Sequence, residues 1–370
     1  MWLKQLSVLN FKNAAEATCD FAPDVNAFTG VNGAGKTNML DAIHYLALCK
    51  SYFNPIDSQQ IKSEQEWFMV QGVFEKGIQN DTISCSLKRN QKKQFKKNKK
   101  EYDRLADHIG LYPLVMISPY DSAIILDGSE ERRKFMDSVL AQTDATYLDR
   151  LIRYNRILLN RNMLLKQTPR HLALDQSLME VLDSQLHELG TFLFEKRTAF
   201  MKIFVENFDR HYQFLCDGAE KVDLQYQSPL QERSLEAWLA QSFEKDRLLE
   251  RTSVGIHKDE LSFTIHGDKS LKKFGSQGQQ KSFLISLKLA QYSYLFKQKG
   301  FKPILLLDDI FDRLDEYRTT KLMQMVSDED FGQIFITDTD ADRIKRIFET
   351  IQKPVRMFKI EQGTIHSQGH

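Results

Sequence analysis

The strongest constraint on the fold of this chain is the distance in sequence between two short motifs that usually cooperate in one site. Residues 30–37 read Gly-Val-Asn-Gly-Ala-Gly-Lys-Thr, a glycine loop whose backbone N–H groups and lysine surround a phosphate chain. Roughly 270 residues later, the apolar segment 304–307 ends in Asp308 and Asp309, a natural place to hold Mg²⁺ beside that phosphate. In a compact fold of this type the two motifs lie closer together. The separation predicts a large insertion between two halves of one nucleotide site.

The composition indicates an ordinary soluble globular protein with room for two or three domains. The chain has 370 residues, of which 42% are hydrophobic and 27% charged, and its formal net charge is +1. This charge gives no overall field that would draw the protein onto nucleic acid or an anionic membrane. The four cysteines form no C-x-x-C pair, which argues against a disulfide framework or a zinc site. Without a leader-like start or a membrane-length apolar run, we expect a cytoplasmic protein with no membrane partner.

Hydrophobic patterns predict an α/β fold with an inserted helical lobe. Predicted strands cover 6–11, 17–21, 26–29, 67–74, 82–87, 113–119, 261–265, 304–307 and 333–337. From residue 129 to about 250, proline nearly disappears and leucines recur at helical spacing. We therefore predict that residues 1–128 and 251–370 form one nucleotide-binding domain, and that 129–250 form a mostly helical second lobe.

The glycine loop assigns a role to several of its positions. Gly30 and Gly35 allow close approach of the backbone, Lys36 reaches the terminal phosphates, and Thr37 supplies a hydroxyl to Mg²⁺. A chance match is the alternative, but a predicted strand precedes the loop and a predicted helix follows it, as the motif requires. The expected nucleotide contacts are Gly30, Val31, Asn32, Gly33, Ala34, Gly35, Lys36 and Thr37.

The two consecutive aspartates predict a metal site and a base. Asp308 would hold Mg²⁺ through water, whereas Asp309, which points the other way in an extended chain, would polarise the attacking water. A single aspartate in this position can instead be a helix N-cap. Two in succession, in a chain that already carries a phosphate loop, favour metal binding. Asp309 and Lys36 are thus predicted to be catalytic, and Thr37 and Asp308 to bind the metal.

A second anion site is predicted at residues 276–279, which read Ser-Gln-Gly-Gln before an apolar helix. A serine and backbone N–H groups at a helix N-terminus attract anions, although the segment alone is equally a polar turn capped by Ser276. Because it lies about thirty residues before Asp308 in a chain with one phosphate loop, we expect it to grip nucleotide held by another subunit. Ser276 would then be catalytic, and Ser276, Gly278 and Gln279 would contact the nucleotide.

One stretch is strongly basic although the whole chain is not. Eight of the thirteen residues from 88 to 100 are basic, namely Lys88, Arg89, Lys92, Lys93, Lys96, Lys97, Lys99 and Lys100. A solvated hairpin loop is the alternative. In a nearly neutral protein, this density favours contacts with a DNA backbone, which depend on charge and shape rather than on base sequence.

As a set, these motifs resemble an ABC-type ATPase head. Residues 276–279 resemble its S-G-G-Q signature and Leu314-Asp315 its D-loop, and the insertion lies where chromosome-maintenance ATPases carry coiled coils. Several segments further resemble the RecF family of recombination mediators. They are LSVLNFKN (6–13), NGAGKTNMLDAI (32–43), ISPYD (117–121), GSEERRKFMD (128–137), GIHKDEL (255–261) and LDDIF (307–311).

The resemblance implies an ABC-type P-loop head with a mixed sheet, ATP and Mg²⁺ as cofactors, and an ATP-dependent homodimer in which each Ser276 closes the other subunit's site. Such a dimer would clamp double-stranded DNA and double-strand/single-strand junctions at gaps. With RecR and RecO it would help to load recombinase for gap repair and replication restart, as in the SOS response. Weak, DNA-stimulated ATP hydrolysis would reset the dimer.

Two positions depart from the family pattern. Asn54 stands where the family has an arginine after the first helix, and strand 333–337 is not followed by the usual switch histidine. Sensing of the γ-phosphate at this place would then fall to Thr337, to Asp338 or to no residue. Residues 118–121 are the best candidate for the Q-loop, and we expect His257 to be structural.

Two other classes of protein share parts of this pattern. A transporter-type ATPase subunit has the same motifs, but the helical insertion and the basic run argue against it. An ATPase head of the double-strand-break-repair or overcoming-lysogenization type, which acts with a nuclease, would need a long coiled coil or a nuclease domain. The sequence contains neither.

Overall fold

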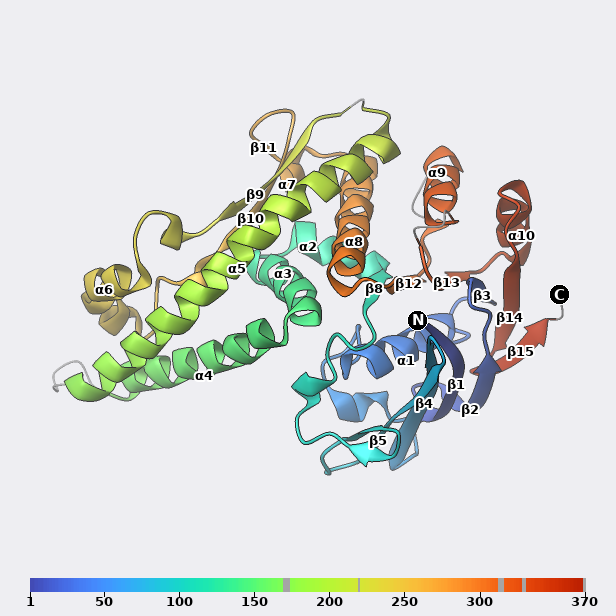
Figure 1. Cartoon of the computed structure of the whole chain (residues 1–370), viewed down its shortest axis with the longest axis horizontal. Coiled ribbons are helices and arrows are strands. Elements are labelled where there is room, and N and C mark those ends of the chain that lie inside the picture. The colour runs from blue at the N-terminus through green and yellow to red at the C-terminus, as the bar shows by residue number, and fades with distance from the viewer. Residues whose placement is uncertain (169–173, 219, 312–315, 328–330, 369–370) are drawn as a thin grey trace. The chain divides into compact units, whose positions relative to one another are not determined.

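The computed structural model describes residues 1–168, 174–218, 220–311, 316–327 and 331–368 (Figure 1). Its contacts divide the chain into two compact units. Unit 1 comprises Met1–Ser122, His211–Asp217 and Lys281–His370, and unit 2 comprises Ala123–Arg210 and Gly218–Gln280. Both ends of the chain therefore belong to unit 1.

A six-stranded sheet brings the separated motifs of unit 1 together. Its strand order is β15-β14-β3-β13-β12-β8, and only the β14–β15 pair is antiparallel. The strands are β3 (Val25–Thr29), β8 (Leu114–Ile117), β12 (Ile304–Leu307), β13 (Ile334–Asp338), β14 (Val355–Glu361) and β15 (Thr364–Gln368). β3, β8, β12 and β13 are buried along their whole length, which explains their continuous apolar runs. Because parallel strands end at one edge, the residues after β3 and β12 meet there.

A second, antiparallel sheet has the order β2-β1-β4-β5-β6-β7. Its strands are β1 (Trp2–Phe11), β2 (Ala14–Asp20), β4 (Trp67–Lys76), β5 (Gln79–Lys88), β6 (Gln94–Lys97) and β7 (Lys100–Glu101). The predicted strands 67–74 and 82–87 are confirmed, and they form a hairpin in which β4 pairs with β5 from Trp67↔Lys88 to Lys76↔Gln79. Helix α1 (Lys36–Leu48) is buried on nearly all sides in one apolar core to which both sheets contribute. The glycine loop is thereby held between a buried strand and a buried helix.

The remaining elements of unit 1 are short connections and helices. They are η1 (Asp57–Gln60), η2 (Leu105–Asp107), η3 (Pro119–Asp121), α9 (Glu316–Ser327), α10 (Ala341–Thr350) and the greater part of α8 (Gln277–Lys299). The apolar helix expected after residues 276–279 is therefore confirmed as α8.

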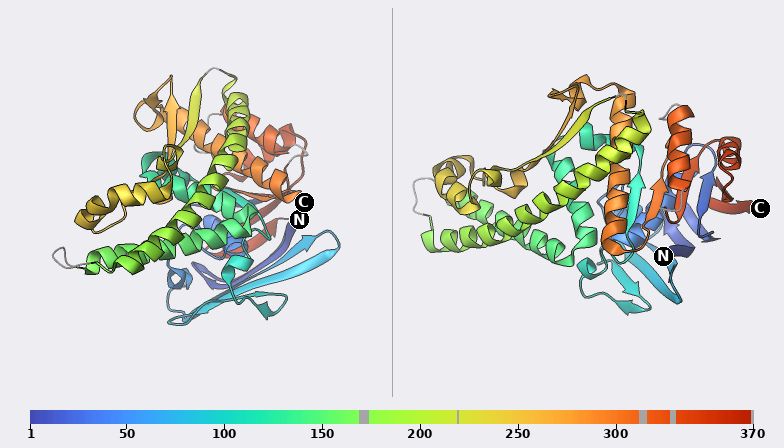
Figure 2. Two further views of the ribbon diagram at one scale, coloured as in Figure 1. Left: turned by 60° about the vertical axis from the view of Figure 1, so that its left-hand side comes forward. Right: turned by 45° about the horizontal axis from the view of Figure 1, so that its top comes forward.

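Unit 2 combines helices with a small sheet. The helices are α2 (Ser122–Leu126), α3 (Ser129–Thr143), α4 (Ala145–Gln167), α5 (Gln176–Cys216), η4 (Pro229–Gln231), α6 (Leu235–Leu249), η5 (Ile256–Lys258) and α7 (Leu271–Phe274). The first residue of α2 and the last turns of α5, from His211, belong to unit 1. The sheet has the order β11-β10-β9, from β9 (Val222–Gln227), β10 (Glu260–Ile265) and β11 (Lys269–Ser270). Helix α5 has 41 residues. Figure 2 shows it as one continuous helix.

The extent of unit 2 differs from the predicted lobe 129–250. It begins at Ala123 and reaches Gln280, because β10 pairs with β9 along its whole length, from Glu260↔Gln227 to Ile265↔Val222. The sequence places the predicted strand 261–265 in the nucleotide-binding domain. Strand patterns alone do not reveal the partner strand, and here the partner lies inside the insertion.

Candidate nucleotide site

The glycine loop joins β3 to α1 in a conformation that its glycines permit. Gly30 and Gly35 have φ angles of 148° and 115°, outside the range that other residues readily adopt. A Cβ atom on Gly30 would lie 2.4 Å from the carbonyl oxygen of Ile360, and one on Gly35 would lie 2.7 Å from the side chain of Asn13. Both positions thus exclude larger residues for reasons of backbone and space.

Neighbouring elements brace the loop from outside. The Asn13 side chain donates from Nδ2 to the carbonyl oxygen of Ala34 at 3.0 Å and accepts from Asn38 at 2.7 Å. The backbone N–H of Gly363, between β14 and β15, donates to the same Ala34 oxygen at 2.8 Å. The sequence places Asn13 in a family motif but assigns no role to it, and no sequence pattern marks Gly363. Only the fold brings these residues, which are far apart in sequence, to the loop.

Lys36 is buried against the loop that precedes it. Its Nζ atom donates to the carbonyl oxygens of Gly30 at 2.7 Å and Val31 at 3.1 Å, and the residue is only 7% exposed. The ammonium group is therefore held within the loop, where it can meet the oxygens of a bound phosphate.

The carboxylate of Asp308 lies beside the end of the glycine loop. Thr37 Oγ1 donates to Asp308 Oδ1 at 2.9 Å, although the two residues are 271 positions apart. Burial raises the pKa of Asp308, and the nearby charge of Asp309 adds to this, whereas hydrogen bonds from Thr337 and Thr37 oppose it. A cation between Thr37 and Asp308 would relieve this cost. No cluster of three or more His, Cys, Asp or Glu side chains suited to a metal occurs among the described residues. Mg²⁺ would therefore need phosphate and water oxygens as further ligands.

Thr337, on the neighbouring strand β13, connects the two aspartates. Its hydroxyl donates to Asp308 Oδ1 at 2.9 Å and accepts from the backbone N–H of Asp309 at 2.9 Å. Asp309 has a φ of 50°, so the prediction of an extended chain at this residue is wrong. The left-handed turn, fixed through its N–H by Thr337, determines where the Asp309 side chain begins.

Asp338, the last residue of β13, makes its polar contacts with α10 and the turn before it. Asp338 is 1% exposed and forms a two-point ion pair with Arg343 of α10, with contacts of 2.6 and 2.8 Å. It also accepts from the backbone N–H of Asp340 at 2.9 Å. Asp338 therefore orders the start of α10, and Thr337 is the residue that faces the acidic pair.

The candidate Q-loop segment, 118–121, joins a buried polar chain. Asp121 accepts from Tyr52 and pairs with Lys288 of α8 at 2.6 Å, and burial raises the pKa of Tyr52 well above its ordinary value. The backbone N–H of Tyr52 donates to Asp41 at 2.7 Å. Sequence reasoning missed Tyr52 and Lys288, because no local pattern distinguishes them from other core residues.

Asn54, at the position of the family's arginine, is used locally. Its side chain donates to Gln59 at 2.5 Å and accepts from the backbone N–H of Ile56 at 3.0 Å. These contacts shape the turn before η1. They leave no cationic group at this position for a phosphate.

Ser276 forms a capping box at the start of α8, within unit 2. Its Oγ accepts from the backbone N–H of Gln279 at 3.2 Å, and its own N–H donates to Gln279 Oε1 at 2.7 Å. The alternative role of a helix cap is thus realised. The serine is exposed, and a hydroxyl that accepts one hydrogen bond keeps its own proton to donate. The proposed D-loop residues Leu314 and Asp315 lie outside the described residues.

The basic run is only partly a solvated surface. Lys93 pairs with Asp57 at 2.8 Å and donates to the carbonyl oxygen of Cys49, and Lys97 pairs with Asp81 at 2.8 Å. Lys96 is half-buried on β6. The exposed cations are Lys88, Arg89, Lys92, Lys99 and Lys100. Strand β6 therefore divides the run into structural and surface lysines, which composition alone does not distinguish.

Comparison with known proteins identifies a family. The chain matches the family described as RecF/RecN/SMC N terminal domain over residues 2–366. It is 49% identical over 360 residues to the DNA replication and repair protein RecF of Flavobacterium johnsoniae, covering 97% of this chain and 100% of that protein. It is 48% identical over 365 residues to the protein of the same name from Parabacteroides distasonis, covering 99% of each.

Solved structures agree with this relationship. A structure of the recombination mediator protein RecF with ATP in the RecFOR pathway matches 100% of this chain and 98% of its own, with a TM-score of 0.89 and 28% identity. An Smc head bound to the C-winged helix domain of ScpA matches with a TM-score of 0.58 and 14% identity, over 100% and 98%, which shows a shared fold alone. In the described part of this chain, no helix is long and apolar enough to cross a membrane.

Proposed function

This chain belongs to the RecF family, within the RecF/RecN/SMC N-terminal domain group, and we propose that it is an ATP-dependent clamp on DNA in replication and repair. The observation that carries the proposal is the convergence of Lys36, Thr37, Asp308 and Thr337 at one edge of the parallel sheet. That arrangement fits a nucleoside triphosphate with a divalent cation, and a relative solved with ATP has the same fold.

Binding of ATP follows from the loop and its lysine. Backbone N–H groups of residues 33–37 would meet the phosphates, and Lys36 would exchange the carbonyl oxygens of Gly30 and Val31 for phosphate oxygens. Mg²⁺, when bound, would supply charge neutralisation at the β- and γ-phosphates. Thr37 and Asp308 are the residues of this chain that would hold it.

Hydrolysis needs a base that takes a proton from the attacking water, and Asp309 is the candidate. Thr337 is a positioning residue, because its hydroxyl fixes the backbone from which the Asp309 side chain extends. We expect turnover to be weak and stimulated by DNA, so that it acts as a timing step that resets the clamp.

The finer parts of the proposal concern partners. Ser276, Gly278 and Gln279 would close the ATP site of a second copy, so that ATP drives formation of a homodimer. The dimer would hold duplex DNA at double-strand/single-strand junctions. RecR, together with RecO, would then act on the loaded clamp to place recombinase at the gap. The membership of a solved relative in the RecFOR pathway supports this assignment.

Sedimentation velocity tests the clamp directly. The protein is measured with and without a non-hydrolysable ATP analogue, each with intact or gapped duplex DNA. We expect a monomer without nucleotide, a dimer with the analogue, and a dimer–DNA complex favoured by gapped duplex. A sedimentation coefficient unchanged by the analogue, with or without DNA, would contradict the proposed clamp.

The Thr337→Val variant should separate the positioning of Asp309 from the binding of ATP. Valine keeps the volume but removes the hydroxyl, so the N–H of Asp309 and Oδ1 of Asp308 each lose a partner. We expect the single-turnover rate of ATP hydrolysis to fall about tenfold or more, with the Kd for ATP within a few-fold of wild type. Thr337→Ser should restore the rate, and Asp309→Asn gives the reference for loss of the base. A Thr337→Val protein that hydrolyses at the wild-type rate would remove Thr337 from the mechanism.

The exposed part of the basic run should contribute to DNA affinity. The variant changes four exposed lysines to glutamine, namely Lys88, Lys92, Lys99 and Lys100, and leaves the ion pairs of Lys93 and Lys97 intact. We expect the slope of log K against log salt for duplex binding to fall by up to about four units, because each lost phosphate contact removes about 0.9.

A matched control tests whether total charge alone explains the result. It replaces four exposed lysines outside the run with glutamine, namely Lys245, Lys297, Lys345 and Lys353. This variant carries the same net charge as the first and should retain the wild-type slope. Equal slopes for the two variants would mean that the basic run is a solvated surface with no specific contact to DNA.

A further inference from the structure

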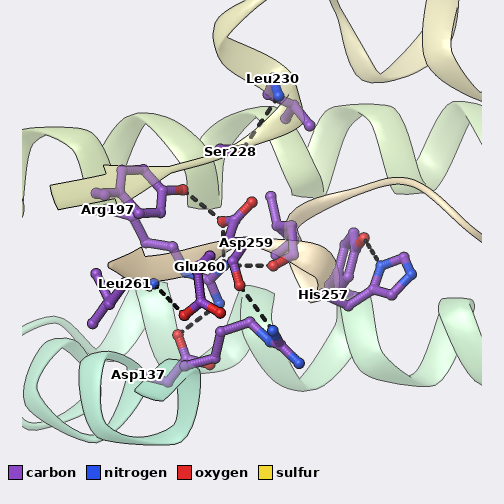
Figure 3. A network of polar contacts seen from close by, with 12 residues as sticks. Asp137, Arg197, Ser228, Leu230, His257, Asp259, Glu260 and Leu261 are labelled. Carbon is purple, nitrogen blue, oxygen red and sulfur yellow. Dashed lines mark hydrogen bonds and ion pairs between the residues drawn. The ribbon is translucent and has the colours of Figure 1, made fainter. Parts of the chain in front are cut away.

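A buried ionic network organises unit 2 around Arg197 of α5 (Figure 3). Arg197 Nη2 pairs with Asp137 at 2.8 Å, and Nη1 pairs with Asp259 at 2.6 Å and donates to the carbonyl oxygen of Ile256 at 2.8 Å. Tyr226 donates to the same Asp259 oxygen at 2.5 Å. Since burying charges is a poor source of stability, the effect of such a network is to fix positions. It fixes the turn around η5, residues 256–258.

The segment that leads to η5 is held by a second set of polar contacts. Arg161 pairs with Asp246 at 2.8 Å and donates to the hydroxyl of Thr252 at 3.0 Å. His257 contacts Tyr154 through Nδ1 at 3.0 Å and the carbonyl oxygen of Thr252 through Nε2 at 3.1 Å. Burial lowers the pKa of His257 to about 4, so the ring is neutral near pH 7. Residues 252–257 are therefore rigid and carry no charge of their own.

Three cations gather at this rigid segment. Arg251 and Lys258, at its two ends, are exposed, and the half-buried Arg133 of α3 donates to the carbonyl oxygen of Asp259 at 2.8 Å. Lys258 is close enough to the other two that their charges, after the larger effect of burial, lower its pKa, whereas Asp246 raises it. In the part of the chain that the structure describes, Arg251 and Lys258 have no ion-pair partner.

Several carboxylates near these cations are already engaged. Asp246 is paired with Arg161 and bonded to Ser253, and Asp259 is held by Arg197 and Tyr226. The two remaining acids near Arg133 have partners of their own: Arg132 binds Glu260 at 2.6 and 2.9 Å, and Lys134 binds Glu130 at 2.9 Å. Nearby carboxylates offset only part of the burial and repulsion that lower the pKa values of Arg133 and Lys258. An external anion would neutralise these charges further.

We propose that Arg133, Arg251 and Lys258 bind the phosphodiester backbone of DNA. The cations are set on a fixed turn, and two of them are exposed at its ends, which suits phosphates spaced along a duplex rather than one enclosed small anion. This inference rests on the proposed function and deepens it. It gives unit 2 its own DNA contact, in addition to the basic run of unit 1.

The test replaces the two exposed cations, Arg251→Gln with Lys258→Gln, in the full-length protein. The matched control is Arg153→Gln with Arg156→Gln, two exposed arginines of α4 in the same unit. Binding to a short duplex is measured over a series of salt concentrations. We expect the slope of log K against log salt to fall by about two units in the test variant and to stay at the wild-type value in the control. Melting temperatures should match wild type in both.

Each other outcome has a definite meaning. Equal slopes in the test and control variants would overturn the site. Binding of inorganic phosphate to the wild-type protein but not to the test variant, with the same duplex affinity and salt slope in both, would assign the cations to a free anion instead and also overturn it. Failure of the wild-type protein to bind duplex DNA under any condition would refute the proposed function, which is a separate result.

Discussion

Replacing Lys36 with alanine is expected to lower the affinity for ATP at least about a hundredfold, equivalent to roughly 3 kcal/mol. The lysine is the only cation that the structure shows donating to the carbonyl oxygens of Gly30 and Val31, among the residues described. Its loss removes the charge that meets the β- and γ-phosphates. Equilibrium binding of a fluorescent ATP analogue measures the effect.

The same substitution also removes the two hydrogen bonds from Lys36 to the glycine loop. The thermal stability of the variant must therefore be measured separately. Lys62→Ala is the matched control, because Lys62 donates to the carbonyl oxygen of Asn13 at 2.8 Å beside the loop but not to the loop itself. Thermal unfolding of both variants should remain cooperative. An affinity for ATP within a few-fold of wild type in Lys36→Ala would mean that residues 30–37 are not the nucleotide site.

Local patterns in the sequence are sufficient to predict many of the strands and the glycine loop of unit 1. The hairpin of β4 and β5 alternates buried and half-buried residues, and the buried strands β8 and β12 are short continuous apolar runs. The glycine loop has dihedral requirements that only glycine meets at Gly30 and Gly35. These features depend on neighbours in sequence, so the sequence alone predicts them.

The parts that were not predicted depend on partners distant in sequence. Thr337 contacts Asp308 across two neighbouring strands, and Gly363 reaches Ala34 from the far end of the chain. The sequence predicts the strand at 261–265 but places it in the nucleotide-binding domain, whereas β10 completes a sheet with β9 of unit 2. A hydroxyl on a strand has no periodic signature, so no pattern could mark Thr337 as the link between the aspartates.

The composition of a segment predicts least well which of its charged side chains form ion pairs and which stay at the surface. Lys93 and Lys97 belong to a basic run, yet each pairs with an aspartate of another segment, and Lys88 and Lys100 remain at the surface. The converse holds in unit 2, where Arg251 and Lys258 are isolated in sequence but gather at one turn. The sequence states which residues are charged. Whether another side chain neutralises a given charge depends on the fold.

Ser276→Arg is expected to abolish ATP-driven dimerisation and hydrolysis while ATP binding persists. The substitution leaves Lys36 and Thr37 unchanged, but it puts a large side chain at the exposed start of α8, where the proposed dimer would place the partner's γ-phosphate. The lost capping bond costs only about 1 kcal/mol, so the protein should still fold. Ser276→Ala controls for the lost cap, because it removes the hydroxyl without adding bulk. Sedimentation with ATP and steady-state turnover are the measurements.

A mixture of two inactive variants decides whether the site is shared between subunits. In a dimer of Ser276→Arg with Lys36→Ala, one composite site pairs an intact Lys36 loop on the first subunit with an intact Ser276 on the second. We expect an ATP-dependent dimer in the mixture, detectable by sedimentation with one variant labelled, and none with either variant alone. Because one of the two sites remains defective, the mixed dimer should be weaker than wild type. If Ser276→Arg by itself dimerises and hydrolyses ATP as wild type does, then Ser276 is only a helix cap, and the shared-site mechanism is wrong for this chain.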